Sequence, residues 1–357
     1  MMAENHHITD IAIIGAGPVG LFAVFEAGML KCKCHVIDAL DFVGGQCTAL
    51  YPEKPIYDIA GFPAIEATKL IENLKEQAAP FAPVYHLGQR VERVARMSDV
   101  RCQMSEKAPS SDICHPSSGW RIQTSRGITI DCRAILIAAG CGAFGPNRPP
   151  IEGIEGYEGK SVFYSVVRKE DFRDKRIVIA GGGDSAVDWI LALADIAKHI
   201  SVIHRRPKFR CAPESADKMK KLADAGKIEM VIPYQLEGLQ GKNGMLEKVI
   251  VKDLDNNKRE IVADNLLAFF GLSMELGPIA EWGLNLDFNH IKVNPVTLET
   301  SQTGIFAIGD IAKYPGKLKL IACGFSEAAM AAHAIYPLVH PDEALHFEYS
   351  TTKGVPG

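Results

Sequence analysis

The sequence contains little that would tie the protein to nucleic acid or to a lipid bilayer. Its formal net charge is -4 and its isoelectric point is near 6.3, so no overall positive charge draws it to nucleic acid or anionic lipid. No apolar stretch reaches the length of a membrane-spanning helix. The apolar run at 11–25 follows acidic residues and is interrupted by glycines, which is not typical of a signal peptide. We therefore predict a soluble, cytoplasmic protein that binds neither nucleic acid nor membrane.

Cysteine pairs of the kinds that carry electrons or hold metals are also missing. The nine cysteines are scattered without a repeated metal-ligand spacing, which predicts reduced thiols, no disulfide framework and no metal site. No CxxC motif exists, and Pro52 stands where a CxxxxC partner of Cys47 would fall. Cys32 and Cys34 precede a predicted strand, and packing is the simpler role for them. The sequence therefore excludes a redox dithiol of the disulfide-reductase type.

What is present is a repeated unit of strand, glycine-rich turn, helix and strand. It occupies about 11–40 and returns at about 176–206, and a chain of 357 residues is long enough for two domains. Each repeat is a βαβ unit, so we predict an α/β fold with two Rossmann-like dinucleotide-binding domains of the three-layer ββα type. A late apolar run at 304–310 indicates that the chain returns to complete the first domain, so that the second domain is inserted into it.

The first glycine-rich turn directly follows a strand and opens a helix. It contains Gly15, Gly17, Pro18 and Gly20, and the next predicted strand ends at Asp38. Glycines allow a tight turn and close approach of the backbone to a pyrophosphate, while an acidic side chain accepts hydrogen bonds from ribose hydroxyls. The alternative is a plain turn, but strand, helix and terminal Asp together favour a dinucleotide site.

The second turn has the same form but a different charge after its partner strand. Its candidate cofactor-binding residues are Gly181, Gly183, Asp184, Ser185 and Ala186. The following strand ends without a carboxylate and leads into basic residues, the candidates being Arg205, Arg206 and Arg210. Arginine can bind a 2′-phosphate that a carboxylate would repel, so we predict NADP(H) here. The alternative is that these arginines form only a solvated face.

Two dinucleotide sites in one chain point to a flavoprotein that binds FAD first and a nicotinamide second. The late run closes on Gly309 and Asp310, and Asp310 would then lie beside the ribityl and phosphate part of FAD; its alternative role is a helix cap. The segment at 44–63 holds Tyr51 and Tyr57, either of which could stack on a flavin ring or pack in a core. Spacing alone does not choose between the two tyrosines.

The motifs together resemble a known family. GAGPVGLF, GGQCTALYPEKPIYDIAGFP, GGGDSAVDW, HRRPKFR, FAIGD and KLKLIACGFSEA occur in this order between Ile11 and Thr352 and resemble the ferredoxin:NADP reductases of the thioredoxin-reductase-like type. The resemblance implies a homodimer with noncovalent FAD, hydride transfer between NADPH and flavin N5, and single-electron exchange with ferredoxin, an acidic iron-sulfur protein. A flavin or quinone reductase or oxidase that uses NADPH without ferredoxin is the alternative.

The resemblance also assigns roles and boundaries. It implies that Tyr51 stacks on the flavin and that Tyr349, in a C-terminal tail at 341–357 that covers the flavin, shields it. The alternative for the segment with Tyr349 is a frayed chain end. No residue is expected to act as general acid. The expected FAD domain spans 1–147 and 276–340, and the expected NADP domain 148–275. The implied FAD contacts are Gly15, Gly17, Pro18, Gly20, Asp38, Gly45, Gln46, Tyr51, Val91, Phe144, Asp310 and Thr351.

Two remaining features concern the surface. Lys313, Lys317 and Lys319 follow Asp310, and they form either a docking patch for an acidic partner or ordinary solubilising charges. The polar stretch at 104–119 is rich in Pro and Ser and is expected to be a loop within a hairpin, longer than is usual in the family. It carries no predicted chemistry.

Overall fold

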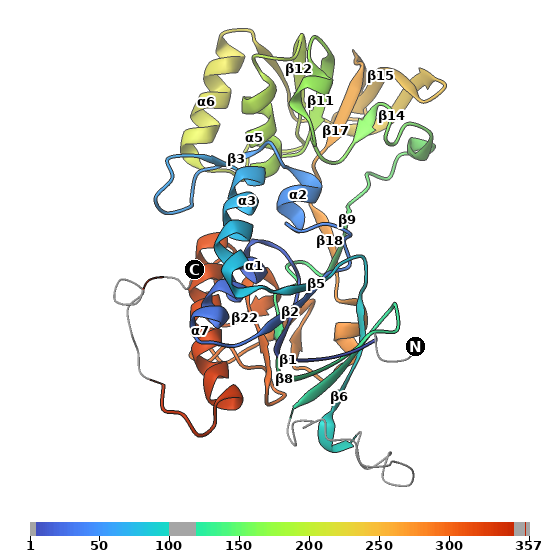
Figure 1. The fold of residues 1–357 in the computed structure, drawn as a ribbon. Helices are drawn as coiled ribbons and strands as arrows, with labels where there is room; N and C mark the ends of the chain where they lie inside the picture. The colour runs from blue at the N-terminus through green and yellow to red at the C-terminus, as the bar shows by residue number, and fades with distance from the viewer. Residues whose placement is uncertain (1–4, 100–118, 346–353, 355–357) are drawn as a thin grey trace. The chain divides into compact units, whose positions relative to one another are not determined.

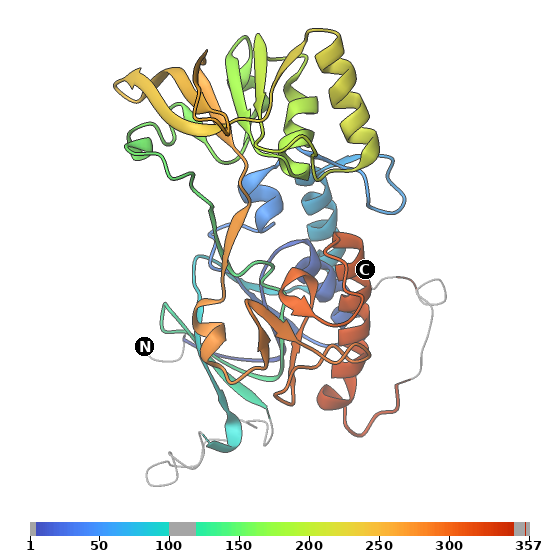
Figure 2. The same ribbon diagram turned by 180° about the vertical axis from the view of Figure 1, so that it is seen from behind.

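The computed structural model describes residues 5–99, 119–345 and 354, without the side chains of 143 and 144 (Figure 1, and from behind in Figure 2). The chain divides into two compact units, each of which has its own sheet and its own core. The first unit comprises Met1–Ala49, Pro55–Ala143 and Met274–Gly357, and the second comprises Leu50–Lys54 and Phe144–Ser273.

The first unit is built on a seven-stranded sheet in the order β5-β2-β1-β8-β7-β6, with β21 paired to β8. The pairs among β5, β2, β1, β8 and β21 are parallel, and β6 and β7 are antiparallel. The central strands are apolar on both faces because both faces are covered. The strands are β1 (His6–Ile14), β2 (Cys34–Ile37), β5 (Val84–His86), β6 (Val91–Arg96), β7 (Trp120–Thr124), β8 (Thr129–Ile137) and β21 (Ile305–Ala307).

Three helices cover one face of this sheet: α1 (Pro18–Met29), α3 (Ala67–Ala78) and α7 (Ile321–Val339). Figure 1 shows α1 between α3 and α7, and their buried side chains share a core with the sheet. A second core on the other face includes the 3-10 helix η4 (Gly277–Glu281). The shorter elements are α2 (Gln46–Leu50), β3 (Pro55–Ile56), β4 (Ile65–Glu66), η1 (Ala79–Phe81), β19 (Leu286–Asp287), β20 (His290–Lys292), η5 (Gly309–Ile311) and β22 (Ala312–Lys313).

The second unit repeats the plan with a parallel sheet in the order β10-β17-β11-β12-β13 and a three-stranded antiparallel sheet β14-β15-β16. One core joins the helices to the parallel sheet, and another lies between the two sheets. The elements are β10 (Val162–Phe163), η3 (Lys169–Phe172), β11 (Arg176–Ala180), α5 (Asp184–Leu193), β12 (His199–Ile203), α6 (Pro213–Asp224), β13 (Ile228–Val231), β14 (Gln235–Lys242), β15 (Met245–Lys252), β16 (Lys258–Val262) and β17 (Asn265–Ala268).

The chain leaves the first unit along β9 (Ala143–Pro146) and returns along β18 (Leu272–Glu275). The late strand β21 then pairs in parallel with β8, with Ile305 opposite Ile135, so residues that follow the second unit complete the first sheet, as the sequence pattern predicted. The expected loop at 104–119 lies almost wholly outside the described residues, although β6 and β7 on either side of it do form an antiparallel pair. Within the part of the chain that is described, no helix combines the length and apolar character that a bilayer crossing requires.

Candidate nucleotide-binding sites

The first glycine turn joins β1 to α1 and is tightly packed on one side and open on the other. Gly15 has φ of +112°, and a Cβ there would lie 2.3 Å from the Ala138 carbonyl oxygen, so glycine is needed beside the end of β8. A Cβ on Gly20 would lie 2.0 Å from the Gly15 oxygen. Gly17, the N-cap of α1, instead has no heavy atom within 4 Å of a Cβ position, and no described side chain caps the helix. The first N–H groups of α1, beyond Pro18, therefore face a space suited to an anion.

The loop before α2 lies against this turn. The N–H of Gly44 donates a 2.8 Å hydrogen bond to a carbonyl of the turn, and a Cβ on Gly45 would lie 3.1 Å from the Gly17 Cα. Gln46 begins α2, and its Nε2 lies 3.6 Å from the position that a Gly140 Cβ would take. The structure thus brings Gly45 and Gln46 together with the glycine turn.

Asp38 follows β2 and links the turn to the next loop. Its Oδ2 accepts a 2.6 Å hydrogen bond from Ala16 N, and its Oδ1 accepts one of 2.8 Å from Leu40 N. Burial raises the pKa of Asp38, and the backbone N–H groups act in the opposite direction. Each carboxylate oxygen keeps a lone pair for a further donor, such as a ribose hydroxyl.

A buried carboxylate that the sequence analysis did not single out holds the late turn of Gly309 and Asp310. Glu327 in α7 is only 2% exposed. Its Oε2 accepts a 2.7 Å hydrogen bond from Gly309 N, and its Oε1 accepts one of 2.6 Å from the Tyr314 hydroxyl and is paired with Lys317. The sequence pattern could have indicated this burial, because Glu327 lies on the same helix face as small apolar residues. The buried face of α7 carries Gly324, Glu327, Ala328 and Ala331.

Lys317 is therefore not the exposed docking lysine that we considered. Its side chain is 4% exposed and its ammonium group is paired with Glu327, because a buried charge requires a partner. Lys313 and Lys319 are exposed. Of the three lysines after Asp310, these two remain candidates for contact with another protein.

The remaining residues that were expected to contact FAD differ in their exposure. Asp310 is partly exposed in η5, and no interaction of its side chain is seen within the described part of the chain. Val91 is 3% exposed and belongs to the core beneath the sheet, so its side chain does not line an open site. The side chain of Phe144 is not described, and Tyr349 and Thr351 lie outside the described residues.

Tyr51 is grouped with the second unit rather than with the turn at Gly15. It packs against the helix-side core of that unit, and the Nζ of Lys54 lies 5.6 Å from the centre of its ring. The segment that carries it is anchored at two points. Lys54 Nζ lies 2.6 Å from an Asp188 carboxylate oxygen in α5, and Glu53 accepts a 2.8 Å hydrogen bond from the Lys169 N–H.

The second glycine turn repeats the geometry of the first between β11 and α5. Gly181 has φ of +152°, and a Cβ there would lie 2.5 Å from the Phe269 carbonyl oxygen. Gly183 is the N-cap of α5; its Cβ position has no heavy atom within 4 Å, and no described side chain caps the helix. Asp184 and Ser185 are exposed in the first turn of α5, whereas Ala186 is fully buried. This turn too leaves an open, electropositive helix terminus.

The basic segment after β12 folds back onto this turn. The N–H of Arg210 donates a 2.7 Å hydrogen bond to Gly182 O, and the backbones of Arg210 and Gly183 form an isolated bridge. His204 lies over Gly182, where a Cβ would come within 2.2 Å of its ring. Burial lowers the pKa of His204, and the nearby arginines lower it further. The backbone pairing therefore brings a basic cluster to the open end of α5.

The three predicted arginines of this segment have no acidic partners in the described part of the protein. Arg205, Arg206 and Arg210 are all exposed, and none occurs in an ion pair with a described residue. Arginines that only form a solvated face commonly pair with neighbouring carboxylates, as Arg168 does with Asp171. Three unpaired guanidinium groups beside a glycine turn are instead suited to a phosphate group.

Comparison with known proteins decides which family this geometry belongs to. Residues 9–333 match the family described as pyridine nucleotide-disulphide oxidoreductase. The chain belongs to this family. It is 60% identical over 350 residues to the Ferredoxin--NADP reductase of Acidiphilium cryptum and 56% identical over 350 residues to that of Paramagnetospirillum magneticum. Each alignment covers 98% of both chains, and the resemblance inferred from the motifs is confirmed.

Solved structures of thioredoxin reductases share the fold. The thioredoxin reductase of T. acidophilum superposes with a TM-score of 0.77 at 22% identity, covering 92% of this chain and 98% of its own. That of Lactococcus lactis gives a TM-score of 0.75 at 21% identity, covering 93% and 99%. The predicted α/β fold with two Rossmann-like units is confirmed.

Within the described part of the chain, the cysteines form no disulfide pair. The cysteines in the described part of the chain are all free. Burial raises the pKa of Cys32 to about 12 and raises that of Cys34 as well, so neither thiol forms a reactive thiolate near neutral pH. The described residues also contain no group of three or more His, Cys, Asp and Glu side chains arranged to hold a metal ion.

Proposed function

We propose that the chain is an FAD-dependent ferredoxin:NADP+ oxidoreductase, which transfers a hydride between NADP(H) and flavin and exchanges single electrons with ferredoxin. The observation that carries the proposal is the contrast between two glycine turns of one type. Asp38 directly follows the strand after the first turn, whereas the strand after the second turn leads into unpaired Arg205 and Arg206. Relatives at 56% and 60% identity that carry the name Ferredoxin--NADP reductase support it.

The glycine turn and Asp38 of the first unit suit the phosphates and a ribose of FAD. The uncapped terminus of α1 and the absence of a Cβ on Gly17 leave room for a pyrophosphate, and Asp38 has capacity for a ribose hydroxyl. When bound, FAD supplies both hydride and single-electron chemistry. The residues that we propose to hold it are Gly15, Gly17, Pro18, Gly20, Asp38, Gly45, Gln46, Phe144, Asp310 and Thr351, with Tyr51 and Tyr349 against the flavin ring. Val91 would take part only through its backbone, because its side chain is buried in the core.

The second unit would hold NADP(H) with its phosphates at the start of α5 and its 2′-phosphate among the arginines. Backbone N–H groups at the start of α5, after Gly181 and Gly183, would bind the pyrophosphate. Arg205, Arg206 and Arg210 would donate to the 2′-phosphate the charge-assisted hydrogen bonds that distinguish NADPH from NADH. Asp184, Ser185 and Ala186 complete the turn. The protein groups bind and orient the two rings, and we assign no general acid or nucleophile.

The lack of a redox dithiol separates this chain from disulfide reductases. No CxxC pair exists in the sequence, and the buried thiols of Cys32 and Cys34 have raised pKa values. Electrons must therefore leave the flavin site directly for an external carrier, which favours a one-electron partner such as ferredoxin over a protein disulfide.

The decisive experiment is anaerobic stopped-flow mixing of the purified protein with NADPH and then with oxidised ferredoxin, followed by flavin absorbance. We expect yellow protein, rapid bleaching by NADPH and recovery of the colour as ferredoxin is reduced. Bleaching that reverses with quinone or oxygen but not with ferredoxin would instead identify a flavin or quinone reductase or oxidase. A colourless protein that does not take up FAD would contradict the proposal as a whole.

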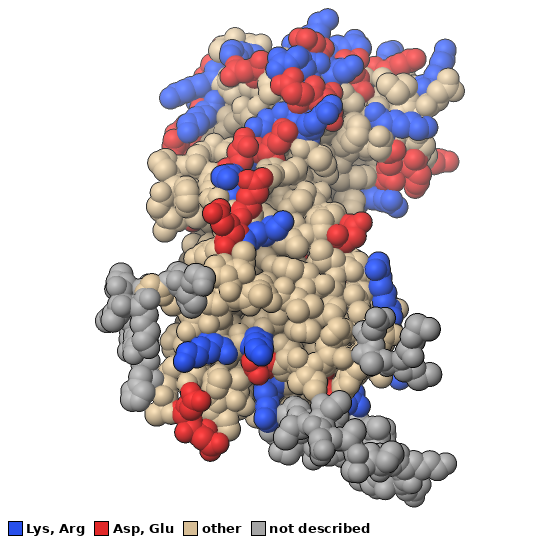
Figure 3. All heavy atoms as spheres, in the orientation of Figure 1, with Lys and Arg blue, Asp and Glu red and all other residues tan. Residues whose placement is uncertain are grey.

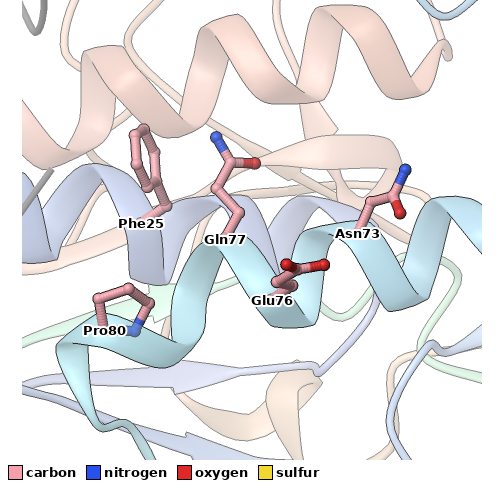
Figure 4. Close-up of a pocket in the computed structure, with 5 residues that line it drawn as sticks. All are labelled: Phe25, Asn73, Glu76, Gln77 and Pro80. Atoms are coloured by element: carbon pink, nitrogen blue, oxygen red, sulfur yellow. The ribbon is translucent and has the colours of Figure 1, made fainter. Parts of the chain in front are cut away.

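We further propose that the enzyme is a cytoplasmic homodimer whose tail at 341–357 covers the flavin. A row of phenylalanines on the first unit supports a second copy as the partner. The ring centres of Phe325 and Phe22 lie 4.8 Å apart, those of Phe22 and Phe25 5.6 Å, and those of Phe25 and Phe81 5.8 Å. Phe25 lines a groove of about 380 Å³ together with Asn73, Glu76, Gln77 and Pro80, and Figure 4 shows Phe25 next to Gln77.

A further inference from the structure

A strained and exposed phenylalanine stands at the tip of the β19–β20 hairpin. Phe288 has φ of +53° and is 93% exposed. A bulky side chain disfavours the left-handed region, and an apolar ring in water gains nothing from folding. Neither the backbone nor the packing of the unit explains a phenylalanine here. Strained residues of this kind are concentrated at sites of binding.

Three lysines are gathered around the same hairpin. Lys292 in β20 lies directly beside Lys313 in β22 in the parallel register, although like charges placed side by side destabilise a sheet. Lys313 and Lys319 both lie close enough to His290 to lower its pKa, in addition to the larger effect of burial. All three lysines are exposed, and none forms an ion pair with a residue of the described chain.

Apolar side chains complete the surface. Leu318 is 59% exposed and Leu320 is 40% exposed, and they flank Lys319 in the segment before α7. Asp287 is the acidic residue of the hairpin and is partly buried. On the face seen in Figure 3, charged side chains are dense over the second unit and sparse over the first. Exposed lysines and exposed leucines are therefore combined in this part of the first unit.

The position of this cluster along the chain relates it to the candidate flavin site. The strand β22 directly follows η5, which carries Asp310, and the segment with Lys319 leads into α7, whose Glu327 holds the same turn. Cations with apolar groups suit a weak, transient contact in which charge steers an acidic protein and a small apolar area completes the fit. Direct electron exchange needs such a contact close to the cofactor.

We propose that Phe288, Lys292, Lys313, Leu318, Lys319 and Leu320 form the docking surface for an acidic iron-sulfur electron carrier. This inference rests on the proposed function and adds to it the place where the one-electron partner binds. The charge of the surface selects the partner, because three unpaired lysines attract an acidic protein and repel a basic one.

The test compares two double variants of the full-length enzyme, with a purified acidic [2Fe-2S] ferredoxin as the probe. K313E/K319E reverses the charge of the docking surface. K198E/K242E makes the same change in net charge at exposed lysines elsewhere, before β12 and at the end of β14. We expect K313E/K319E to raise the KM for ferredoxin about ten-fold at low ionic strength and to weaken its dependence on salt. A KM equal to that of the control variant would overturn the inference.

A second variant separates docking from stability. Phe288→Gly should keep or raise the thermal midpoint, because glycine adopts a positive φ without strain, and should raise the KM for ferredoxin several-fold. An unchanged KM in this variant would show that the ring takes no part in docking.

The binding of ferredoxin is also measured by calorimetry without NADPH. Loss of binding in K313E/K319E but not in the control supports the docking surface even if turnover fails, and equal binding in both overturns it. Bleaching of the flavin by NADPH alone, measured on the unaltered enzyme, tests the proposed function separately, so that the two failures are distinguishable.

Discussion

At the scale of single residues, we propose that Arg205 and Arg206 are the main determinants of specificity for NADPH over NADH. Both are exposed and unpaired within the described chain, at the end of the strand that follows the second glycine turn. The variant R205A/R206A should raise the KM for NADPH by roughly 100-fold or more, because it removes two charge-assisted hydrogen bonds that each contribute about 1.5 to 3 kcal/mol. The KM for NADH should change much less, since NADH has no 2′-phosphate. Steady-state reduction of ferricyanide with each nucleotide measures both constants.

The control for this prediction is Lys208→Ala. Lys208 is an exposed cation of the same segment that we assign no role. Equal effects of R205A/R206A on NADPH and NADH would contradict the assignment of a 2′-phosphate site.

The buried pair of Glu327 and Lys317 gives a prediction about stability. Glu327→Gln should lower the free energy of unfolding by about 3 kcal/mol, because it leaves the ammonium of Lys317 buried without a compensating charge. The double variant E327Q/K317M should recover most of that loss, since both charges are then removed. Denaturant unfolding of the native protein, E327Q, K317M and the double variant measures the coupling. Simple additivity of E327Q and K317M would show that the two charges do not depend on each other.

At the scale of elements, the neighbouring strands β2 and β5 contain a pair of buried histidines. Nδ1 of His35 lies 2.9 Å from Nε2 of His86, and the ring of His7 in β1 lies 5.0 to 5.4 Å from both rings. Burial and the neighbouring imidazoles lower the pKa of His35 to about 4, and burial also lowers the pKa of His86. Both side chains are therefore neutral in the folded protein near neutral pH.

This pair predicts a loss of stability in mild acid. In the unfolded chain a histidine has a pKa near 6.5, so between about pH 6.5 and pH 4 the unfolded state binds more protons than the folded state. The free energy of unfolding should fall through this window by up to about 1.4 kcal/mol per pH unit for each histidine. His35→Gln should reduce the difference between the free energies of unfolding at pH 7 and pH 5, which urea unfolding at each pH measures. An unchanged pH dependence of the free energy of unfolding, or an equal reduction by the partly exposed control His199→Gln, would contradict this origin.

Elements with a local signal were predictable from the sequence. The runs that became β11 and β12 and the glycine turn between them were recognised because a buried strand, a glycine triplet and a helix each leave a short-range pattern. The helix α7 was recognised from its apolar pattern, and it extends to Val339 although Pro337 lies inside its last turn. Local chemistry therefore predicted most of both nucleotide-type units.

The features that the sequence did not predict depend on contacts between distant residues. Tyr51 is grouped with the second unit because Glu53 and Lys54 are held by Lys169 and Asp188, more than one hundred residues later. Lys317 is buried because Glu327 faces it from the next helix. Neither contact leaves a mark in the short-range pattern, because a lysine in a turn-rich segment is usually solvated.

At the scale of the whole molecule, the row of aromatic side chains on the first unit requires an explanation that a single chain does not give. Phe22, Phe25 and Phe325 are only partly buried, and exposed Met330 lies on the same helix as Phe325. Contiguous exposed apolar groups on a protein usually mark a contact with another chain. In a homodimer, the same face of a second copy would cover this row across a two-fold axis.

The proposed homodimer gives a prediction about mass in solution. Phe25→Asp should shift the protein from dimer to monomer, because each copy would place an uncompensated carboxylate in an apolar contact. Gln77→Arg, at an exposed position of the same groove, should weaken the dimer with less risk to the fold. Light scattering after size exclusion gives the mass, and circular dichroism checks the fold. Leu254→Asp, which changes an 80% exposed leucine in the turn after β15, is the matched control and should stay dimeric. A dimer that persists in both groove variants, or a native protein that is already monomeric, would show that this face has another role.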